Sequence, residues 1–460
     1  MQQQLEKHQE VLITIKKIGI NGEGIGYYKR QAVFVDGVIP PEEVVVKITE
    51  LHRGYAVGEI VRVKKKAFYR MVPFCPHYGT CGGCQLQHVK YEEQLRLKED
   101  LLKQAFERYT NLDLAKVRFL SHTPLNTPRN YRHKASMPVR NTGSGLVTGL
   151  YKKSSNDLVD VKSCPVQHDT INQTNKAVLE ICDEHDIYAF DPQDMRGLLR
   201  YVVTRISQAS QEIQVTLVVT IYNHALKSAA KAILELPGVV SVAISKNHDA
   251  KNHEIFGDTF EVLAGKESIT ESMGDIHYTL NPKAFYQLNP KAAYAMYQYI
   301  ATLFDNHDQT LLDLYTGSGA MALYFADKFK QVYGIDNAIA SIQSANENKK
   351  INQIDHVHFY HGDAYTALKE LYRQKKSVDV CVFDPPRTGL DTQLMDLLMR
   401  KPIKKLIYVS CNPSTLAKNI KVLSRKYDVK SVMPFDMFPQ TSHVESIVLL
   451  SLKTAQQRYL

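Results

Sequence analysis

The chain has 460 residues, of which 44% are hydrophobic and 23% charged, and its 57 Lys and Arg against 48 Asp and Glu give a net charge of +9. This length exceeds what one hydrophobic core ordinarily supports, so two or three domains are expected, and the positive charge fits a phosphate-rich partner. The sequence contains no run of about 18 apolar residues and no secretory signal at its start, which excludes a membrane-spanning helix and favours a cytoplasmic protein. Seven cysteines in that compartment favour a metal site or catalysis over disulfides.

The first part of the chain, residues 11–63, shows short strand-like runs that are separated by glycine and proline. Five such strands in so short a segment are typical of a small β-barrel of the oligonucleotide-binding kind. The basic triplet at 64–66 reads as a linker. The sequence therefore predicts an RNA-binding barrel over residues 1–64.

Four cysteines follow with unequal spacing, namely Cys75, Cys81, Cys84 and, after a gap of eighty residues, Cys164. Four thiolates supply the ligands of a tetrahedral metal site, and the glycines at 82–83 let the backbone turn its N–H groups toward sulfur. Zinc usually takes two paired Cys-x-x-Cys units, so the three-plus-one spacing favours a [4Fe-4S] cluster. Because four thiolates leave no iron open, we expect the cluster to have a structural or RNA-positioning role.

The central segment, residues 65–280, predicts an α+β domain that contains the cluster. Residues 91–108 form an amphipathic helix, and the helical region 90–120 could equally pack on the following domain. Tyr131, Arg132 and Lys134 offer an aromatic ring and two cations, which suit either contact with an RNA loop or an ordinary surface.

From residue 281 onward the pattern changes to alternating strands and helices, which predicts an α/β domain with a doubly wound parallel sheet over 281–460. The expected strands are 310–315, 331–336, 356–362, 377–384, 404–410, 429–435 and 444–452. Ligands of such sheets bind at the carboxyl ends of the strands.

Polar residues and glycines gather at those strand ends. Gly317 and Gly319 follow the first strand and allow a nucleotide-like ligand to approach the backbone. Asp336 ends the second strand, where it could accept hydrogen bonds from both hydroxyls of a ribose. Asp363 ends the third strand, where it could reach an adenine amine, and Asp384 ends the fourth. A dinucleotide dehydrogenase accounts for the glycines and Asp336 alone, whereas a methyltransferase that uses S-adenosylmethionine accounts for all of these residues.

Cys411 ends the fifth strand, and Pro413 then suits the first turn of a helix with Asn412 or Ser414 as its cap. A thiol at a helix N-terminus is expected to have a lowered pKa and to act as a nucleophile. The alternative is a buried core cysteine, which is the usual role of a lone cysteine.

Six motifs follow one another along the chain, namely Phe285-Tyr-Gln-Leu-Asn289, Asp313-Leu-Tyr-x-Gly-x-Gly319, Ala345 with Asn348 and Asn352, Asp384-Pro-Pro-Arg-x-Gly389, Ser410-Cys-Asn-Pro413 and His443-Val-Glu445. In content and order they resemble the RNA uracil-5-methyltransferase family, and Gly22–Gly26 with the following strands resembles a TRAM domain. With the four cysteines, the chain resembles the iron–sulfur branch that acts on 23S ribosomal RNA.

This resemblance implies roles for individual residues. It makes Cys411 the nucleophile and Glu445 the proton acceptor, with Gln287, Tyr315, Asp336 and Asp384 as cofactor contacts. Two positions depart from the family pattern: Thr316 replaces a frequent cysteine, and Asp336 stands where glutamate is usual. The shorter aspartate predicts looser or water-bridged ribose binding.

The chemistry of C5 methylation requires the same residue types. Uracil C5 is a poor nucleophile until a thiolate adds at C6, and afterwards a base must remove the C5 proton. Arg387 stands where enzymes that methylate exocyclic amines carry a stacking aromatic. We therefore expect a monomeric enzyme that methylates uridine in an RNA loop, most simply in 23S rRNA, with no DNA or membrane partner. An RNA cytosine-5 methyltransferase and an inactive ribosome-assembly factor are the alternatives.

Overall fold

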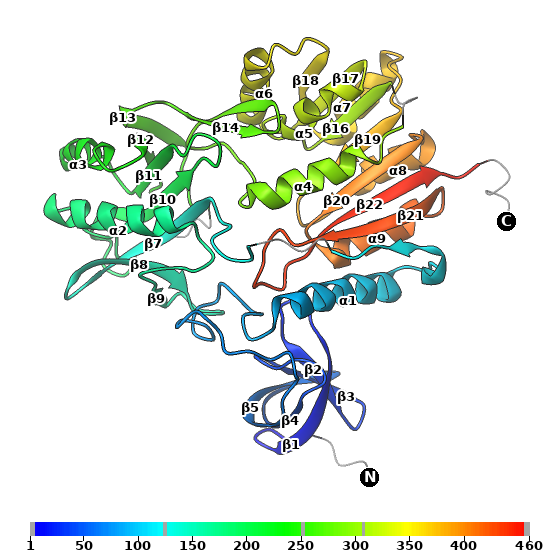
Figure 1. Cartoon of the computed structure of the whole chain (residues 1–460), viewed down its shortest axis with the longest axis horizontal. Coiled ribbons are helices and arrows are strands. Elements are labelled where there is room, and N and C mark those ends of the chain that lie inside the picture. Colours follow the sequence, from blue (N-terminus) through cyan, green and yellow to red (C-terminus); the bar gives the residue numbers. More distant parts are fainter. Residues whose placement is uncertain (1–4, 123–126, 250–253, 306–308, 455–460) are drawn as a thin grey trace.

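The computed structural model describes residues 5–122, 127–249, 254–305 and 309–454. Figure 1 shows a small barrel at one end of the molecule, a central sheet with two helices, and a larger sheet flanked by helices. Within the described ranges, no helix is both long and apolar enough to cross a membrane.

The N-terminal strands close into a barrel in the order β1-β2-β3-β5-β4, which confirms the predicted small barrel. Its interior is filled by alternating apolar residues such as Ile13, Ile15 and Val33. Gly24 is needed for closure, since a Cβ there would lie 2.7 Å from the carbonyl oxygen of Val38. The strands are β1 (Glu10–Ile18), β2 (Gly24–Tyr28), β3 (Gln31–Val35), β4 (Glu43–His52) and β5 (Tyr55–Lys65).

The central part is a seven-stranded sheet in the order β13-β12-β11-β10-β7-β8-β9. Helices α2 and α3 share one hydrophobic core with its strands. The elements are β7 (Lys134–Thr142), β8 (Gly145–Tyr151), β9 (Leu158–Asp160), α2 (Asp169–Glu184), β10 (Leu199–Ile206), β11 (Ile213–Val219), α3 (His224–Leu234), β12 (Val239–Lys246) and β13 (Thr259–Gly265).

The C-terminal part contains an eight-stranded sheet in the order β18-β17-β16-β19-β20-β22-β21-β6. Its elements are α4 (Pro290–Ala301), β16 (Thr310–Leu314), α5 (Ala320–Tyr324), β17 (Gln331–Asp336), α6 (Ile339–Ile351), β18 (Val357–His361), α7 (Ala364–Arg373), β19 (Val380–Phe383), α8 (Thr392–Arg400), β20 (Lys405–Ser410), α9 (Pro413–Leu423), β21 (Tyr427–Phe435) and β22 (Glu445–Leu452). A short 3-10 turn spans Ala326–Lys328.

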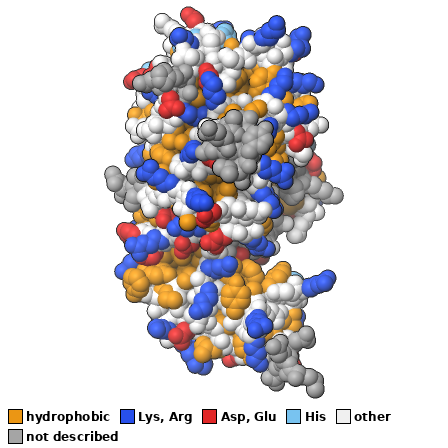
Figure 2. Space-filling model, turned by 90° about the vertical axis from the view of Figure 1, so that its right-hand side faces the viewer, with side chains coloured by type: hydrophobic (Ala, Val, Ile, Leu, Met, Phe, Trp, Pro, Cys, Tyr) orange, Lys and Arg blue, Asp and Glu red, His pale blue; other side chains and the backbone are white. Residues whose placement is uncertain are grey.

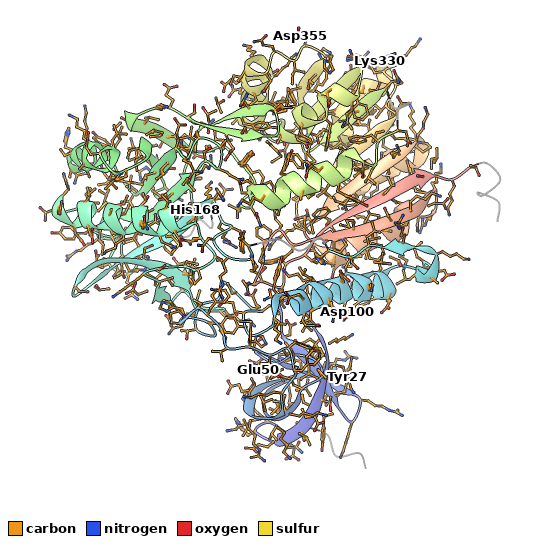
Figure 3. The ribbon with its side chains drawn as sticks, viewed as in Figure 1. Tyr27, Glu50, Asp100, His168, Lys330 and Asp355 are labelled. Carbon is orange, nitrogen blue, oxygen red and sulfur yellow. The ribbon has the colours of Figure 1, made fainter. Side chains whose placement is uncertain are left out.

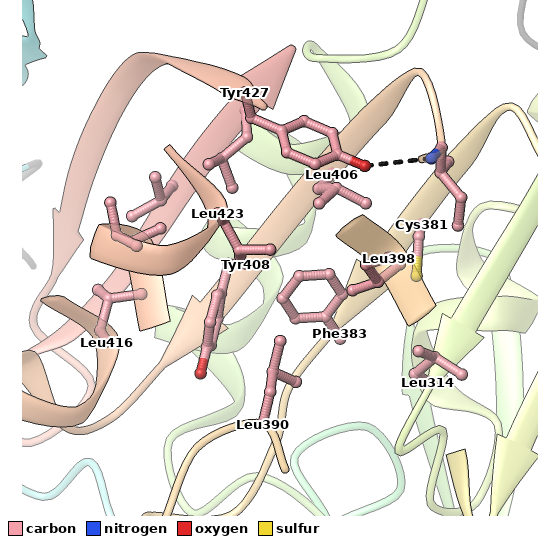
Figure 4. Packing of buried hydrophobic residues seen from close by; sticks show 14 of the residues in the cluster. Leu314, Cys381, Phe383, Leu390, Leu398, Leu406, Tyr408, Leu416, Leu423 and Tyr427 are labelled. Carbon is pink, nitrogen blue, oxygen red and sulfur yellow. Dashed lines mark hydrogen bonds between the residues drawn. The ribbon is translucent and has the colours of Figure 1, made fainter. Parts of the chain in front are cut away.

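Five strands of this sheet are parallel, as predicted, but β22 runs antiparallel to both of its neighbours. The reason is the direct connection from β21 to β22, which is too short for a crossover helix. Helices α7, α8 and α9 pack on one face of the sheet, and α4 and α5 pack on the other. Figure 4 shows the first of these cores, in which the Tyr427 hydroxyl accepts a hydrogen bond from the backbone N–H of Ile403.

Two segments from earlier in the sequence complete this C-terminal core. Helix α1 (Tyr91–Tyr109) packs on α9, and after a 3-10 turn (Leu114–Lys116) the short strand β6 (Arg118–Phe119) extends the sheet beside β21. The hairpin of β14 (Ile269–Met273) and β15 (Ile276–Leu280) packs on the opposite face. Lys98 of α1 forms a fully buried ion pair with Asp436, with 2.6 Å between Nζ and Oδ1.

Candidate active site

Three adjacent strands bring Asp384, Cys411 and Glu445 to one edge of the large sheet. Strands β19 and β20 are parallel, so the residues that follow them lie at the same edge. Strand β22 is antiparallel, and its first residues lie opposite the end of β20, with Ser446 paired to Ser410. The structure therefore places the three predicted catalytic and cofactor residues side by side.

The loop that carries Asp384 is tied to the start of α9. The carbonyl oxygen of Arg387 accepts hydrogen bonds from Asn412 Nδ2 at 3.2 Å and from Thr415 Oγ1 at 2.9 Å. Asn412 is also the N-cap, because its Oδ1 accepts from the N–H groups of Ser414 and Thr415 at 3.1 and 3.3 Å. Those two N–H groups are thus already occupied by Asn412.

The pKa of the Cys411 thiol is raised, not lowered as the sequence predicted. Burial is the main cause, and the nearby carboxylates of Glu445 and Asp384 raise this pKa further. Arg387 opposes them through its charge and a side-chain hydrogen bond to the thiol. The prediction failed because it counted the helix N-terminus but neither the burial of the thiol nor the two carboxylates contributed by other strands.

Glu445 is buried, with 8% of its surface exposed. Burial, and then repulsion from Asp384, raises its pKa well above the usual range, while Arg387 lowers it. Its Oε1 atom is buried and has no hydrogen-bond partner among the described residues. Burial likewise raises the pKa of Asp384 to about 7. Burial and mutual repulsion therefore disfavour the ionised forms of these side chains, and the charge of Arg387 favours them.

The sequence analysis gave Arg387 no electrostatic role and used only the fact that it is not aromatic. Its side chain is exposed, yet its charge lowers the pKa of both Cys411 and Glu445. Its position in the sequence, directly after two prolines at the end of a strand, could have indicated a cation in the active site.

In the glycine loop between β16 and α5, three alternate residues have a left-handed backbone conformation. Their φ angles are 64° at Tyr315, 56° at Gly317 and 81° at Gly319. A Cβ on Gly317 would meet nothing within 4 Å, so this glycine borders open space. A Cβ on Gly319 would lie 2.6 Å from the ring of Phe359, so this glycine is required by packing. Only Gly317 has the surroundings of a ligand-facing position.

Asp313, just before this loop, has a structural role that the sequence did not suggest. Its Oδ2 accepts from the Thr316 hydroxyl at 2.5 Å and from the N–H of Ala322 at 3.1 Å. Burial raises the pKa of Asp313 to about 7. Thr316, which departs from the family pattern, thus anchors the loop through its hydroxyl.

The two remaining predicted aspartates also bond to backbone. Asp336 accepts from the N–H of Gly317 through Oδ2 and from that of Ala338 through Oδ1, both at 2.9 Å. Asp363 caps α7, accepting from the N–H of Thr366 at 2.9 Å, and this bonding to Thr366 lowers its pKa. Each carboxylate oxygen has further acceptor capacity, so both residues could still contact a ligand.

Gln287 lies in the segment that leads into α4. The carbonyl of Leu288 accepts from the N–H of His133 at 2.9 Å, and Asn289 Nδ2 donates to the carbonyl of Met437 at 3.1 Å. These bonds hold the half-buried Gln287 between the central sheet and the β21–β22 loop.

The four predicted metal-binding cysteines Cys75, Cys81, Cys84 and Cys164 line one small pocket together with Arg132. The N–H of Gly83 points at Cys81 Sγ at 3.4 Å, as expected from the two glycines. Among the described residues, however, no group of three or more His, Cys, Asp or Glu side chains is arranged to hold a metal ion. The predicted metal cluster is therefore not shown by the structure.

Tyr131 matches neither reading that the sequence left open for it. It is buried, with 5% exposed, and its hydroxyl donates to the carbonyl of Pro439 at 3.0 Å. Its neighbour Arg132 lies beside the cysteine pocket instead of on an open surface.

Comparison with known proteins gives two family matches. The tRNA (uracil-5-)-methyltransferase family model matches residues 90–453, and the TRAM domain model matches residues 4–61. Two relatives are described as uncharacterized RNA methyltransferases. The protein of Bacillus anthracis is 37% identical to this chain over 98% of both chains, and that of Halalkalibacterium halodurans is 39% identical over 97% of both.

Similarity to a solved structure extends along nearly the whole chain. The tRNA (uracil-54, C5)-methyltransferase of Pyrococcus abyssi, crystallised with S-adenosyl-L-homocysteine, has a TM-score of 0.76 and 26% identity, and the match covers 96% of this chain and 100% of that one.

Proposed function

Because the chain belongs to the tRNA (uracil-5-)-methyltransferase family and begins with a TRAM domain, we propose that it methylates C5 of a uridine in 23S rRNA through a covalent bond between Cys411 and the base. That it is an S-adenosylmethionine-dependent RNA uracil-5-methyltransferase follows from the family itself. The choice of 23S rRNA rests on the four cysteines and their resemblance to the iron–sulfur branch. The observation that carries the mechanism is the meeting of Cys411, Asp384 and Glu445 at one sheet edge.

The reaction begins at Cys411. S-adenosylmethionine, when bound, supplies an electrophilic methyl group. The Cys411 thiolate adds to C6 of uracil, and the electron pair of the C5–C6 double bond then makes C5 nucleophilic enough to take that methyl group. Arg387 assists by favouring the thiolate over the thiol.

Glu445 completes the reaction by accepting the proton from C5. The double bond then re-forms and the C6–sulfur bond breaks, which returns the thiolate. A buried carboxylate with a raised pKa is a stronger base once it has ionised, which suits a weakly acidic carbon acid. Asp384, on the neighbouring strand, would contact the cofactor and would be the alternative base.

The cofactor would lie along the strand ends of β16 to β19. Gln287, Tyr315, Gly317, Asp336, Asp363 and Asp384 are the proposed contacts. Open space at Gly317 and the spare acceptor capacity of Asp336 support a ribose there.

We further propose that Cys75, Cys81, Cys84 and Cys164 hold a [4Fe-4S] cluster. Their shared pocket supports four ligands to one group. Each of the four cysteines would supply one thiolate ligand, and the cluster would have a structural or RNA-positioning role. The proposed enzyme is a monomer with three parts: a barrel (1–64), a central part that contains the cluster (65–280) and a methyltransferase part (281–460). Helix α1 belongs to the central part by sequence but packs on the methyltransferase part.

Two measurements test the function. Release of tritium from RNA labelled at C5 of uridine, but not of cytidine, would establish the base, and the opposite result would identify a cytosine-5 methyltransferase. Mass mapping of 23S rRNA and tRNA from a deletion strain would identify the target, and a missing methyl group in tRNA would overturn the ribosomal assignment. A Cys411→Ala strain with normal ribosome maturation would separate catalysis from an assembly role.

A further inference from the structure

The loop that joins β21 to β22, residues 436–444, leads directly into Glu445. In Figure 1 it reaches the N-terminal end of α1. Loops ordinarily run over the surface, but most of this one is buried, and its backbone polar groups therefore need partners inside the protein. The residues that are at most 3% exposed are Asp436, Met437, Gln440, Thr441, Ser442 and Val444.

Every polar atom of Gln440 is hydrogen-bonded to another segment of the chain. Its N–H donates to Oε1 of Gln94 at 3.0 Å, and its carbonyl accepts from the N–H groups of Gln85 and Leu86 at 3.0 and 2.9 Å. Its side-chain oxygen accepts from Nε2 of Gln94 at 2.9 Å, and its side-chain nitrogen donates to the carbonyl of Pro128 at 3.3 Å. All of these partners come from much earlier in the sequence, so Gln440 joins the loop to the N-terminal half of the chain.

The backbone of Gln440 has a φ of 71°, which lies in the left-handed region that residues other than glycine rarely adopt. Such a conformation costs free energy and persists only where its surroundings hold it. The hydrogen bonds to Gln94 and to the segment at 85–86 hold it here. They therefore fix the direction in which the chain runs on toward Glu445.

Helix α1 also fixes the beginning of the loop. Charged side chains ordinarily lie at the surface, as those in Figure 2 do, but the side chains of Lys98 and Asp436 are fully buried as an ion pair. Nζ of Lys98 also donates to the carbonyl of Phe438 at 3.0 Å. Figure 3, in which Asp100 marks α1, shows this helix between the barrel and the large sheet. The helix thus holds the loop at its start and at Gln440.

Glu445 depends on this backbone for its position. Oε1 of its carboxyl group has no hydrogen-bond partner among the residues that the structure describes. The pairing of Ser446 with Ser410 fixes the start of β22 on one side, and the loop fixes it on the other. A general base must lie within hydrogen-bond reach of the proton that it removes, and a misplacement of about 1 Å can lower a rate by about a hundredfold.

We infer that Gln440 is a positioning residue for the removal of the C5 proton: together with Gln94 of α1, it sets the place of Glu445 relative to Cys411. The inference rests on the proposed function, in which Glu445 is the base. It implies a specific defect when the loop is loosened. Loss of the C5 proton and release of Cys411 from C6 become slow, whereas addition of the thiolate and transfer of the methyl group continue.

Gln94→Leu tests the inference, because leucine has no side-chain atom that can bond to Gln440. During turnover of 23S rRNA transcribed in vitro, the methylated protein–RNA complex should accumulate as a slower band on a denaturing gel, with turnover reduced by about ten- to a hundredfold. Adduct formation with 5-fluorouridine RNA needs Cys411 but not the base, so its rate should stay within about twofold of wild type. An adduct that forms as slowly as turnover would overturn the inference, since the loop would then serve folding or binding in general.

Leu102→Ala is the matched control within α1. Leu102 is 1% exposed and lies in the core that α1 shares with α9, so its truncation should lower the melting temperature without reaching the loop. The covalent complex should not accumulate in this variant. Equal accumulation in Leu102→Ala and Gln94→Leu would contradict a role for the bonds to Gln440.

Two substitutions of Gln440 itself test the importance of its backbone conformation. Asparagine tolerates the left-handed region, whereas a β-branched residue is strained there. Both substitutions lose the original side-chain bonds, but Gln440→Val should accumulate more of the covalent complex than Gln440→Asn. Normal turnover in Gln440→Val would overturn the inference.

Hydrogen exchange measures the loop independently of the chemistry. Backbone amides of residues 436–445 should exchange faster in Gln94→Leu than in wild type, and unchanged exchange would overturn the inference. The two proposals also fail differently. If the Cys411 chemistry is wrong, wild-type protein will form no adduct with 5-fluorouridine RNA. If the chemistry is right and the positioning role is wrong, Glu445→Gln will accumulate the covalent complex and Gln94→Leu will not.

Discussion

The sheet edge at Cys411 and the pocket of Cys75, Cys81, Cys84 and Cys164 both hold thiols that are at least half-buried, but they differ in what surrounds the sulfur. In the pocket, the pKa of Cys84 is raised to about 12, chiefly by burial and also by Cys164 and Cys81, while Gln87 and Arg132 oppose the rise. At Cys411 the neighbours that raise the pKa are carboxylates. A thiol among carboxylates can exchange protons and act in turnover, whereas thiols gathered among themselves gain most from a bound cation.

The largest expected effect is the loss of activity in Cys411→Ala, which changes the sheet edge and leaves the cysteine pocket unaltered. Methylation should fall below detection and no covalent complex with 5-fluorouridine RNA should form, because the carbon–sulfur bond cannot be made. Denaturing gel electrophoresis and tritium release measure the two losses. Cys381→Ala, which removes a fully buried thiol from the neighbouring strand β19, is the control and should keep its activity. Retained methylation without Cys411 would remove the nucleophile from the proposal.

Glu445→Gln should stop the reaction at a later point. The thiolate still adds and the methyl group still transfers, but the C5 proton cannot leave. A methylated protein–RNA complex should therefore accumulate as a slower band on a denaturing gel, with turnover reduced by about 10²–10⁴-fold. Normal turnover would exclude Glu445 as the base and point to Asp384.

Cys164→Ala should change the other region and leave the sheet edge nearly intact. Protein purified without oxygen should lose its iron, and its melting temperature should fall by about 5–10 °C. Affinity for S-adenosylmethionine should persist. Cys182→Ala alters a fully buried cysteine of α2 that lies in a hydrophobic core, and it should keep its iron. Stoichiometric zinc and no iron in the wild-type protein would contradict the cluster.

Asp336→Ala should weaken binding of S-adenosylmethionine by at least about tenfold, since hydrogen bonds from a ribose to a carboxylate contribute roughly 1.5–3 kcal/mol each. Part of the loss would come from the glycine loop, which loses the bond between Gly317 and Asp336. Asp336→Asn keeps an acceptor and should lose less. Titration calorimetry that returns wild-type cofactor affinity for both variants would refute this contact, while RNA affinity should be unchanged in either case.

Arg387→Gln should give the smallest change, and one that depends on pH. The arginine lowers the pKa of Cys411, so its removal should raise that pKa and shift the rise in activity to higher pH. Activity near neutral pH should drop several-fold, and the difference from wild type should narrow as the pH is raised. A pH–rate profile that matches wild type would show that the guanidinium has no part in forming the thiolate.

The sequence predicted the helices and strands better than it predicted the electrostatic effects between residues that are distant in sequence. Apolar periodicity and glycine positions were sufficient for the small barrel and for the strands on either side of Gly317 and Cys411. They could not show that β22 runs antiparallel, because strand direction depends on the loop at 436–444. Nor could they show that Glu445 and Asp384 raise the pKa of Cys411, since residues far apart in sequence meet only after folding. Tyr131 was misread for the same reason, as its partner is Pro439.

The packing of α1 on α9 has a consequence for synthesis of the chain. Helix α1 leaves the ribosome about 300 residues before its partner, and until then Leu102, Ala105 and Phe106, which join the C-terminal core, have no core to enter. Lys98 likewise has to wait for Asp436 before its charge can be neutralised in the interior. The nascent chain therefore exposes this part of the apolar face of α1 through most of translation. A prematurely terminated product should be a preferred client of chaperones and proteases.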